Sequence, residues 1–517
     1  MPAPKNAWRS PGDRGTPSLT ELSTEPEMDH SAARRASALA SELSRRHLAL
    51  TQPYDLSSHA ILERQARQES NARSYPRRLP LVLKRAAGVY VEDIEGRVFI
   101  DCLAGAGTLA LGHNHPVVIE AIGAALDAGL PLHTLDLSTP VKDRFVQDLF
   151  DALPGDFARK AKVQFCGPSG ADAIEAAAKL VKTATGRGTL LAFQGAYHGM
   201  TQATLQLMGS LGPKVPLNGI LTGVQFLPYP YDYRCPMGLR GDAGAQAGLR
   251  YIESVLSDPE GGVPAPAGLI LEAVQGEGGV IPAPAAWLQK LRALTAAADV
   301  PLILDEVQSG FGRTGKMFAF EHAGITPDVV ALSKAIGGGL PLAVIVYQGE
   351  LDQWKPGAHA GTFRGNQLAM AAGSATIRFI RDEGLTGRAR ELGERLSSAL
   401  EELKAACPLI GDVRGRGLML GAEIVEPSGA LDAHGYPAAA PALARTIQQE
   451  CLRRGLILEL GGRHGCVVRF LPPLTITERE LDRAVDIFGQ SLRAATKTIR
   501  NESVNAAHET VELGAPI

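Results

Sequence analysis

The sequence predicts an α/β protein, with a mostly parallel central sheet in a large domain and a smaller α+β C-terminal domain after it. Between Lys162 and Val346, short apolar runs alternate with helical stretches, which is typical of parallel strands joined by crossover helices. The runs are residues 163–165, 190–193, 269–271, 302–304, 329–332 and 342–346. From Gln367, helical patterns over 367–380 and 388–406 precede short strand candidates, which favours a separate α+β unit.

Changes in composition along the chain suggest five segments. A hairpin is expected from residues 89–91 and 98–100, and a closing helix over 475–495 would begin with a capping box formed by Thr477 and Glu480. The expected segments are a mostly disordered extension with a possible helix near its end (1–50), a segment that covers the functional site (51–100), the large domain (101–370), the small C-terminal domain (371–496) and a frayed tail (497–517).

The composition is that of an ordinary soluble globular protein. Of the 517 residues, 45% are hydrophobic and 21% are charged, and the formal net charge of −3 gives no electrostatic reason to expect nucleic acid or a membrane surface as a partner. No apolar run approaches the ~20 residues that span a bilayer, and the polar start does not resemble a secretory signal. The six cysteines are scattered without metal-ligand spacing, so we expect free thiols, a cytoplasmic location and no metal site.

An acid and a lysine stand at the ends of two expected strands. Asp305 directly follows the run 302–304, and Lys334 follows the run 329–332 after one serine. Ligands of parallel α/β sheets bind outside the carboxyl ends of the strands, so both side chains are expected at one edge of the sheet. Taken singly, each has an ordinary explanation, as an acidic residue at a helix start or as a solvated surface lysine.

A turn of small residues follows the strand candidate 163–165. Ser169, Gly170 and Ala171 lead into a strong helix former, where backbone N–H groups could approach a phosphate at the helix N-terminus and the Ser169 hydroxyl could add a donor. An ordinary strand-to-helix turn, with Ser169 or Asp172 as the N-cap, explains the same residues equally well.

Aromatic and amide side chains would complete a cofactor site. Tyr197, just past the run 190–193, could stack on a ring, with His198 beside it near the substrate, and Gln308 follows Asp305 by three residues. The four features follow one another along the chain, each at the end of an expected strand. They are the small-residue turn at Ser169, the aromatic Tyr197, the acid Asp305 and the amine Lys334. Pyridoxal phosphate needs all four, because a lysine forms a Schiff base with its aldehyde and a carboxylate pairs with its pyridinium nitrogen. Gln308 would reach the ring hydroxyl or the lysine linkage.

The stretch from Asp305 to Lys334 closely resembles the signature of class III pyridoxal-phosphate aminotransferases, and the similarity runs from about Leu62 to Leu492. The resemblance implies the pyridoxal-phosphate fold type I and Lys334 as the catalytic residue. It also implies a homodimer whose active sites form at the subunit interface. Residues 101–370 would then be the cofactor-binding domain.

The resemblance assigns roles to residues that would otherwise be ordinary polar side chains in glycine-rich loops. Thr362 would bind the phosphate in the neighbouring subunit's site. Arg414 would bind the α-carboxylate of glutamate or 2-oxoglutarate, because a guanidinium can bind a carboxylate through two parallel hydrogen bonds. Glu277 would pair with Arg414 when the substrate presents an amine instead of that carboxylate. Glu272 matches a nearby acidic residue with a less defined role.

Residues 69–75, 103–109 and 361–369 resemble the diaminobutyrate–2-oxoglutarate aminotransferases in particular. The expected reaction is reversible transamination between L-glutamate and L-aspartate 4-semialdehyde, giving L-2,4-diaminobutyrate and 2-oxoglutarate. The long N-terminal extension fits the siderophore or diaminopropane-pathway type better than the shorter ectoine-pathway type.

Three alternatives remain open from the sequence. The chain could have another class III specificity (ectoine-pathway diaminobutyrate, 4-aminobutyrate or ornithine), could be a mutase or racemase of the same fold, or could be a non-catalytic binding module. The intact Lys334 and Asp305 argue against a binding module. Arg414 together with Glu277 favours transamination with glutamate over a mutase.

Overall fold

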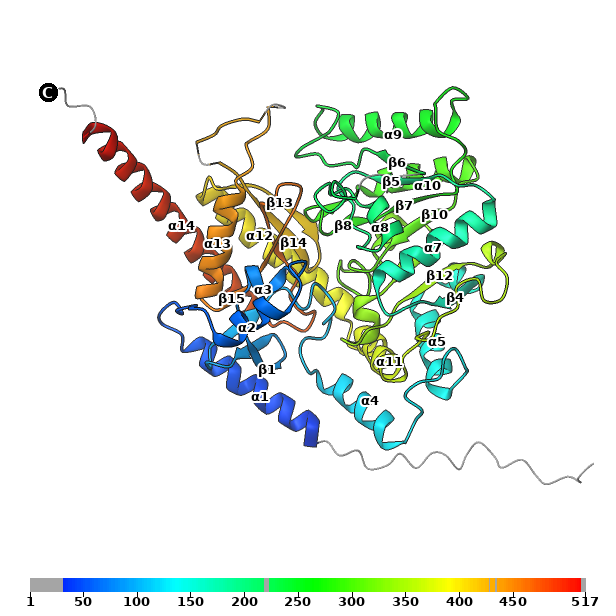
Figure 1. Ribbon diagram of the computed structural model, residues 1–517, viewed down its shortest axis with the longest axis horizontal. Helices are drawn as coiled ribbons and strands as arrows, with labels where there is room; N and C mark the ends of the chain where they lie inside the picture. Colours follow the sequence, from blue (N-terminus) through cyan, green and yellow to red (C-terminus); the bar gives the residue numbers. More distant parts are fainter. Residues whose placement is uncertain (1–30, 218–222, 427, 433–434, 513–517) are drawn as a thin grey trace, which may run out of the picture.

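The computed structural model describes residues 31–512, except 218–222, 427 and 433–434 (Figure 1). Within this part of the chain, a seven-stranded sheet forms the centre of the large domain. Its order is β4 (Ala161–Phe165), β12 (Val344–Gln348), β11 (Val329–Leu332), β10 (Leu302–Asp305), β7 (Gly268–Leu271), β5 (Leu190–Phe193) and β6 (Val224–Leu227).

Most neighbouring strands of this sheet run parallel, and β12 is the exception. β10 pairs in parallel with both β11 and β7, whereas β12 is antiparallel to β11 and to β4. β5, β7, β10 and β11 are buried along their whole length, which explains why they are continuous apolar runs rather than alternating ones. The mostly parallel sheet expected from the sequence is confirmed, and β6 is a strand that the sequence pattern did not reveal.

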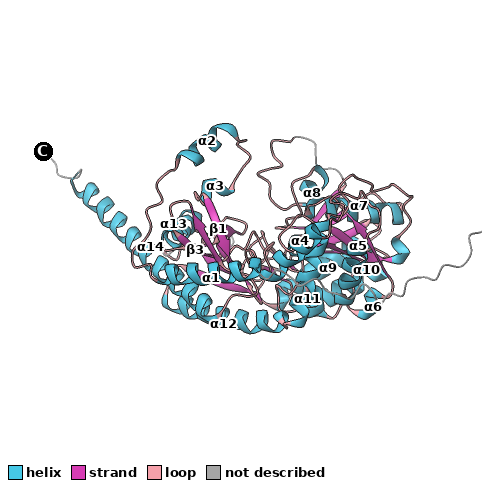
Figure 2. Cartoon of the chain, turned by 90° about the horizontal axis from the view of Figure 1, so that it is seen from below, coloured by secondary structure: helices cyan, strands magenta, loops and turns pink. Residues whose placement is uncertain are grey.

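Helices cover both faces of the sheet. α7 packs against β11 and β12, while α11 packs against α4, α5 and the 3₁₀ turn that begins at Lys334. The helices of this domain are α4 (Pro116–Asp127), α5 (Pro140–Ala152), α6 (Gly155–Ala158), α7 (Gly170–Thr185), α8 (Gln202–Leu207), α9 (Asp242–Ser257), α10 (Ala285–Ala297) and α11 (Gln367–Asp382). In Figure 2, α11 and α12 (Leu385–Ala406) run along the lower side of the molecule between the two domains. The expected domain limit at 370/371 therefore falls inside α11.

The small domain contains an antiparallel four-stranded sheet with helices against it. The strand order is β13 (Ile410–Arg416), β14 (Met419–Ile424), β17 (Val467–Phe470) and β16 (Glu459–Gly461), with α13 (Pro441–Arg453) and α14 (Glu478–Glu512) packed on each other beside it. Thr477 and Glu480 form the predicted capping box, with backbone-to-side-chain distances of 2.8 and 3.3 Å. The backbone of α14 continues past the expected end at 495, so a frayed tail from 497 onward is wrong for residues 497–512.

The N-terminal segment belongs structurally to the small domain. In Figure 1 its blue helices α1 (Ser31–Leu48), α2 (Ala60–Gln68) and α3 (Tyr75–Arg78) lie beside the orange and red C-terminal elements. Strands β1 (Leu83–Ala87), β2 (Tyr90–Asp93) and β3 (Val98–Asp101) form an antiparallel sheet, which includes the predicted hairpin. β15 (Leu456–Ile457) extends this sheet by pairing in parallel with β3.

The possible helix near the end of the N-terminal extension is present, and the structure shows where it packs. Residues 31–48 form α1, whose Leu43 is fully buried and whose Arg46 makes an ion pair of 2.7 Å with Glu92 on β2. The partners of α1 are far away in the sequence, which is why the pattern of the helix alone did not show where it would pack. Residues 1–30 lie outside the described residues. No helix among those described is long and apolar enough to cross a membrane.

Candidate active site

A cavity of about 240 Å³ opens at the carboxyl ends of the central strands. Its walls come from the loops that follow β4, β5, β7, β10 and β11, as expected for a ligand site in a parallel α/β sheet. The lining residues are Ser169, Gly170, Ala171, Tyr197, His198, Gly199, Met200, Glu272, Glu277, Asp305, Val307, Gln308 and Lys334. The structure therefore brings together all the residues that the sequence predicted for the site except Thr362 and Arg414.

Asp305 is the last residue of β10 and is buried at the floor of the cavity. Its Oδ2 lies 2.7 Å from Nδ1 of His198, and its Oδ1 accepts a hydrogen bond of 3.0 Å from the backbone N–H of Val307. These two contacts fix the orientation of the carboxylate. Nε2 of His198, on the other side of the ring, is buried without a hydrogen-bond partner among the described residues.

Lys334 begins the turn that follows β11, and its backbone has a φ of +52°. A side chain other than glycine is uncommon in this left-handed region, and such strain is concentrated at functional sites. Burial lowers the pKa of the Lys334 amine, while the nearby carboxylates of Glu277 and Asp305 act in the opposite direction. A lowered pKa makes a neutral amine, which is the reactive form, more accessible near neutral pH.

The predicted anion cradle lies at the start of α7. The Ser169 side chain caps this 16-residue helix by accepting a hydrogen bond from the N–H of Asp172, as the ordinary N-cap explanation anticipated. A Cβ atom at Gly170 would lie only 2.9 Å from Cγ1 of Val307, so this position leaves room for a glycine alone. The helix N-terminus and its cap both face the cavity, and the two explanations of Ser169 are therefore compatible.

Glu272 ties together the loops that carry Tyr197 and Glu277. Its carboxylate accepts hydrogen bonds from the N–H of Tyr197 at 3.0 Å and from the N–H of Gly276 at 2.8 Å. Burial raises the pKa of Glu272 to about 7. Glu272, whose role the sequence left less defined, thus holds the loop that carries Tyr197.

The predicted pairing of Glu277 with Arg414 is wrong. Oε1 of Glu277 lies 2.5 Å from Nη1 of Arg469, an arginine on β17 whose side chain is fully buried. Oε2 of Glu459 lies 3.3 Å from the same nitrogen, and Arg469 also donates a hydrogen bond of 2.8 Å to Oε1 of Gln308. Arg469, and not Arg414, is therefore the arginine that pairs with Glu277 at the wall of the cavity.

Opposing effects set the ionisation of Glu277. Burial alone would raise its pKa, but the positive charges of Arg469, Lys334 and Arg78 outweigh this and hold the pKa below its ordinary value. Glu277 is therefore a carboxylate near neutral pH. Arg469 was not predicted, because a single arginine in a short apolar strand is usually a side chain on the exposed face of a half-buried strand. The strand 467–470 is instead buried at every position, and a lone charge within an apolar run was the signal that could have indicated a buried ion pair.

Arg414 has a different set of partners, outside the cavity. It lies 2.7 Å from Asp412 and 2.9 Å from Glu423, and its Nε donates a hydrogen bond of 2.8 Å to the carbonyl of Gly279. Its guanidinium also lies over the ring of Tyr231, 4.9 Å from the centroid. These contacts join β13 and β14 to the loop after Glu277, so Arg414 connects the two domains.

Gln308 and Thr362 are placed differently from each other. Gln308 lines the cavity, and its Nε2 donates a hydrogen bond of 3.0 Å to the carbonyl of Ala106 while its Oε1 accepts one from Arg469. Thr362 is exposed and does not line the cavity of its own chain; its carbonyl contacts the ring of His133 at 2.9 Å. Its expected role in a neighbouring subunit remains a prediction.

Cys166, Asp172 and His359 bring three possible metal-ligating atoms within 4.8 Å of one another. Asp172 is already engaged, however, since Arg364 lies 3.1 Å and His359 3.3 Å from its Oδ2. Burial raises the pKa of the Cys166 thiol far above neutrality, which disfavours the thiolate that a metal would need. The group is an ion-pair network beside the cradle.

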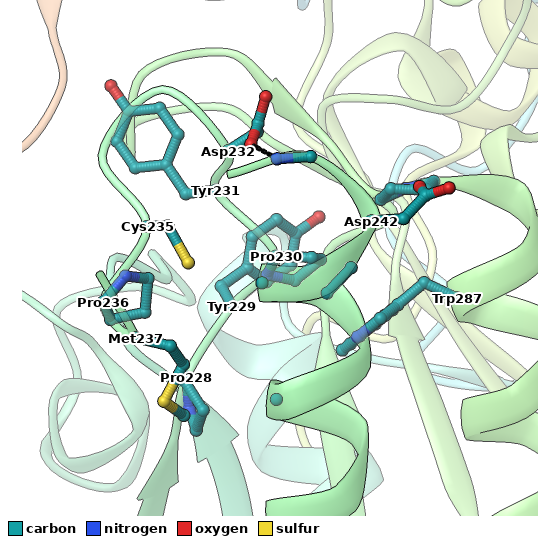
Figure 3. A pocket seen from close by; sticks show the side chains of 15 residues that line it. Pro228, Tyr229, Pro230, Tyr231, Asp232, Cys235, Pro236, Met237, Asp242 and Trp287 are labelled. Carbon is teal, nitrogen blue, oxygen red and sulfur yellow. Dashed lines mark hydrogen bonds between the residues drawn. The ribbon is translucent and has the colours of Figure 1, made fainter. Parts of the chain in front are cut away.

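A second cavity, of about 190 Å³, lies between the segment 228–248 and α10 (Figure 3). Prolines, glycines and the rings of Tyr229 and Trp287 form most of its wall, and Asp232 accepts a hydrogen bond from the N–H of Gly241. None of the described residues that line it carries a positive charge, so it offers no counterpart to the lysine and the cradle of the first cavity.

The family model described as aminotransferase class-III matches residues 71–492 of the chain. The chain belongs to the class III aminotransferases. It is 61% identical to the diaminobutyrate–2-oxoglutarate aminotransferase of Rhizobium meliloti over 422 residues, and this alignment covers 82% of this chain and 90% of the relative. It is 53% identical over 446 residues to the enzyme of that name from Haemophilus influenzae, which covers 86% of this chain and 97% of the relative.

Solved structures of this aminotransferase family have the same fold. A thermostable omega transaminase variant from Pseudomonas jessenii superimposes with a TM-score of 0.76 at 27% identity, covering 85% of this chain and all of that one. An omega transaminase of the same organism in complex with PMP gives a TM-score of 0.75 at 28% identity. The predicted fold type I and the aminotransferase activity are both confirmed.

Aminotransferases of class III use pyridoxal phosphate, and the cavity of this enzyme fits that cofactor. A buried carboxylate, a half-buried lysine and a helix N-terminus against which only glycine fits surround one space. Ser169, Gly170 and Ala171 would hold its phosphate, and Asp305 would hold its ring nitrogen. When bound, the cofactor supplies an electron sink for the carbanion that forms at the reacting carbon of the substrate.

Proposed function

We propose that this aminotransferase transfers an amino group between L-glutamate and L-aspartate 4-semialdehyde, giving L-2,4-diaminobutyrate and 2-oxoglutarate in a reversible reaction. The observation that carries the proposal is the ion pair between Glu277 and Arg469. It occurs in a chain that is 61% identical to a diaminobutyrate–2-oxoglutarate aminotransferase. The pair explains how one pocket accepts two unlike substrates.

Glutamate brings a carboxylate next to its reacting carbon, and diaminobutyrate does not. In the glutamate half-reaction, Glu277 would move away and Arg469 would bind this α-carboxylate through its planar guanidinium. In the diaminobutyrate half-reaction, Arg469 would stay paired with Glu277, so no buried cation is left without a partner. Gln308 and Glu459 keep Arg469 in place in both states because they contact it independently of the substrate.

Lys334 would carry out the proton transfers. Its amine is buried in the cavity with a lowered pKa, which suits a group that takes a proton from one substrate carbon and returns it elsewhere. Asp305 would hold the cofactor nitrogen, and His198 would hold Asp305. Tyr197, kept in place by Glu272, would cover one face of the ring.

The same proposal includes the assembly and the setting of the enzyme. A homodimer would place Thr362 against the phosphate site of the neighbouring subunit. The six cysteines are all free thiols, which supports a reducing cytoplasm. Biosynthesis of a siderophore or of diaminopropane is the proposed use of the product.

A substrate panel tests the assignment. The visible absorption band of the bound cofactor should disappear on mixing with L-2,4-diaminobutyrate or L-glutamate, and much more slowly with ornithine or 4-aminobutyrate. If diaminobutyrate leaves the band unchanged while another ω-amine removes it, the substrate assignment is wrong and the activity is another class III specificity. A product that retains its amino group would instead indicate a mutase or a racemase.

A further inference from the structure

An outer cavity of about 440 Å³ adjoins the cofactor cavity. The two share Tyr197, Met200 and Glu277 in their walls, so a substrate whose reacting end lies at Lys334 could extend into the outer cavity. The other walls come from α3 of the N-terminal segment, from α13, and from the segments 208–210 and 460–465.

Three arginines line the outer cavity, against a single acidic residue, Glu277. Arg77 is engaged, because it donates hydrogen bonds of 3.0 and 3.1 Å to the side chain and backbone of Asn71. Arg78 and Arg445 donate no hydrogen bond to any other residue that the structure describes. The positive charge of Arg78 is one of those that lower the pKa of Glu277. The lining of the outer cavity therefore carries more positive than negative charge, with Arg78 acting electrostatically on Glu277 at the site.

The helix that carries Arg78 is attached to the catalytic site. Tyr75 donates a hydrogen bond of 2.9 Å to Glu459, and Glu459 in turn contacts Arg469. Tyr75 and Arg78 are three residues apart on α3, which places them on the same face of the helix. The contact of Tyr75 thus holds Arg78 at the wall of the outer cavity.

The two proposed substrates carry a carboxylate at the same distance from the reacting carbon. In L-2,4-diaminobutyrate, three carbon–carbon bonds separate the carbon that bears the reacting amine from the carboxyl carbon. In L-glutamate, three carbon–carbon bonds separate the reacting α-carbon from the δ-carboxyl carbon. One fixed cation can therefore serve both half-reactions, whereas the Glu277–Arg469 pair has to open for one of them.

We propose that Arg78 binds this distal carboxylate in both half-reactions, with Arg445 adding positive potential at the rim of the outer cavity. The proposal rests on the proposed function for its choice of substrates. Arg78 is a substrate-binding residue in it, and the N-terminal segment then contributes directly to specificity.

Matched substrates test the proposal on the holoenzyme. Replacing Arg78 by methionine should lower kcat/KM for L-2,4-diaminobutyrate by about 10- to 100-fold, because a charge-assisted hydrogen bond is lost. The rate with 1,3-diaminopropane, the same ω-amine without a carboxyl group, should change less than about twofold. L-Glutamate and L-norvaline, which has a methyl group in place of the distal carboxylate, form the same comparison for the other half-reaction. Arg67→Met on α2, outside both cavities, is the control and should leave all four rates unchanged.

Binding of an unreactive ligand gives a second readout. Calorimetric titration with glutarate, whose carboxylates are spaced as in glutamate, should show about 10-fold weaker binding to Arg78→Met and unchanged binding to Arg67→Met. Arg78→Lys keeps the positive charge and should therefore recover part of the affinity. This variant also tests the proposal if Arg78→Met folds poorly. Equal losses with and without the distal carboxylate, or no loss with either, overturn the proposal. Failure of the wild type to use diaminobutyrate rejects only the proposed function, since the glutamate and norvaline comparison still decides the role of Arg78.

Discussion

Arg469 lies between two carboxylates, 2.5 Å from Glu277 and 3.3 Å from Glu459, while its own side chain is fully buried. A buried guanidinium needs charged or polar partners, because its desolvation is otherwise costly. Glu277 is the partner that lines the cavity, and Glu459 is held by Tyr75. Arg469 therefore has one carboxylate partner that faces the cavity and one that a second hydrogen bond holds.

Removing the guanidinium should separate the two half-reactions. Arg469→Met should lower kcat/KM for L-glutamate by about 100-fold or more, since the α-carboxylate loses its partner. The half-reaction with the ω-amine should suffer less in a second variant, Arg469→Met combined with Glu277→Gln, because only Glu459, which keeps its hydrogen bond from Tyr75, then loses its cation. Stopped-flow absorbance of each half-reaction measures both rates. Equal losses in both half-reactions would show that Arg469 is only structural.

Lys334→Ala should abolish turnover. The variant should bind the cofactor without a covalent bond and should complete neither half-reaction at a measurable rate, because both the amine partner and the proton carrier are gone. Borohydride reduction followed by peptide mass analysis should label Lys334 in the wild type and no residue in the variant. A Lys334→Ala protein that completes both half-reactions would contradict the assignment.

His198 should act on the cofactor through Asp305. His198→Phe removes the group 2.7 Å from Oδ2 of Asp305 and should weaken cofactor binding by about 10-fold. His198→Asn, which can still donate a hydrogen bond, should retain more of the affinity. Cofactor titration of the apoenzyme, followed by fluorescence quenching, gives both dissociation constants. Identical affinities for the wild type and the phenylalanine variant would rule out this role.

Glu306 should make stability depend on pH. Burial raises its pKa to about 7 in the folded protein, whereas an unfolded glutamate titrates near 4.5. Between these values the folded state binds more protons, so this contribution to the free energy of unfolding is full below about pH 4.5 and is lost as the pH rises through about 7. The contribution is on the order of 3 kcal/mol.

A glutamine at position 306 cannot titrate and should therefore remove this dependence. From pH 5 to pH 8 the urea midpoint of the wild type should fall relative to that of Glu306→Gln, so that any advantage of the wild type becomes smaller or is reversed. The glutamine also disturbs the acceptors for Ser309, Ala319 and Phe320, which should cost about 1 to 3 kcal/mol at every pH. A difference that does not vary with pH would contradict the expected titration.

Leu43→Ala should destabilise the protein through α1. The side chain of Leu43 is fully buried, and replacing a core leucine by alanine costs about 2 to 5 kcal/mol. Leu48→Ala, at an exposed position of the same helix, is the matched control and should cost little. Thermal unfolding of both variants measures the effect, and equal melting temperatures would show that α1 is not part of the cooperative core.

The central sheet was predictable because its strands are buried on both faces. β10 begins with three apolar residues and β11 has four, and Asp305 and Lys334 stand where those apolar runs stop. Their positions at one edge follow from the parallel topology, with no need to know any side-chain contact. The cradle at Gly170 was predictable for the same reason.

Long-range electrostatic partners were not predictable. The pair formed by Glu277 and Arg469 joins residues that are 192 positions apart, and the local sequence around either residue does not indicate its partner. Arg414 was predicted from the family resemblance, yet in the structure its neighbours Asp412 and Glu423 already pair with it. The register between β13, β14 and β17 decides which arginine reaches Glu277, and register depends on tertiary packing.

The pairing of β3 with β15 has a consequence for how the protein is made. Ile100 lies opposite Leu456, so the N-terminal sheet has no fourth strand until almost the whole chain has been synthesised. All seven strands of the central sheet lie between these two residues and can form their own core first. At about 5 to 20 residues per second, the ribosome needs roughly 20 to 70 s to deliver the missing strand. During that time α1 and the N-terminal hairpin are an unfinished half of a domain, which makes them the segment of the nascent chain most in need of protection.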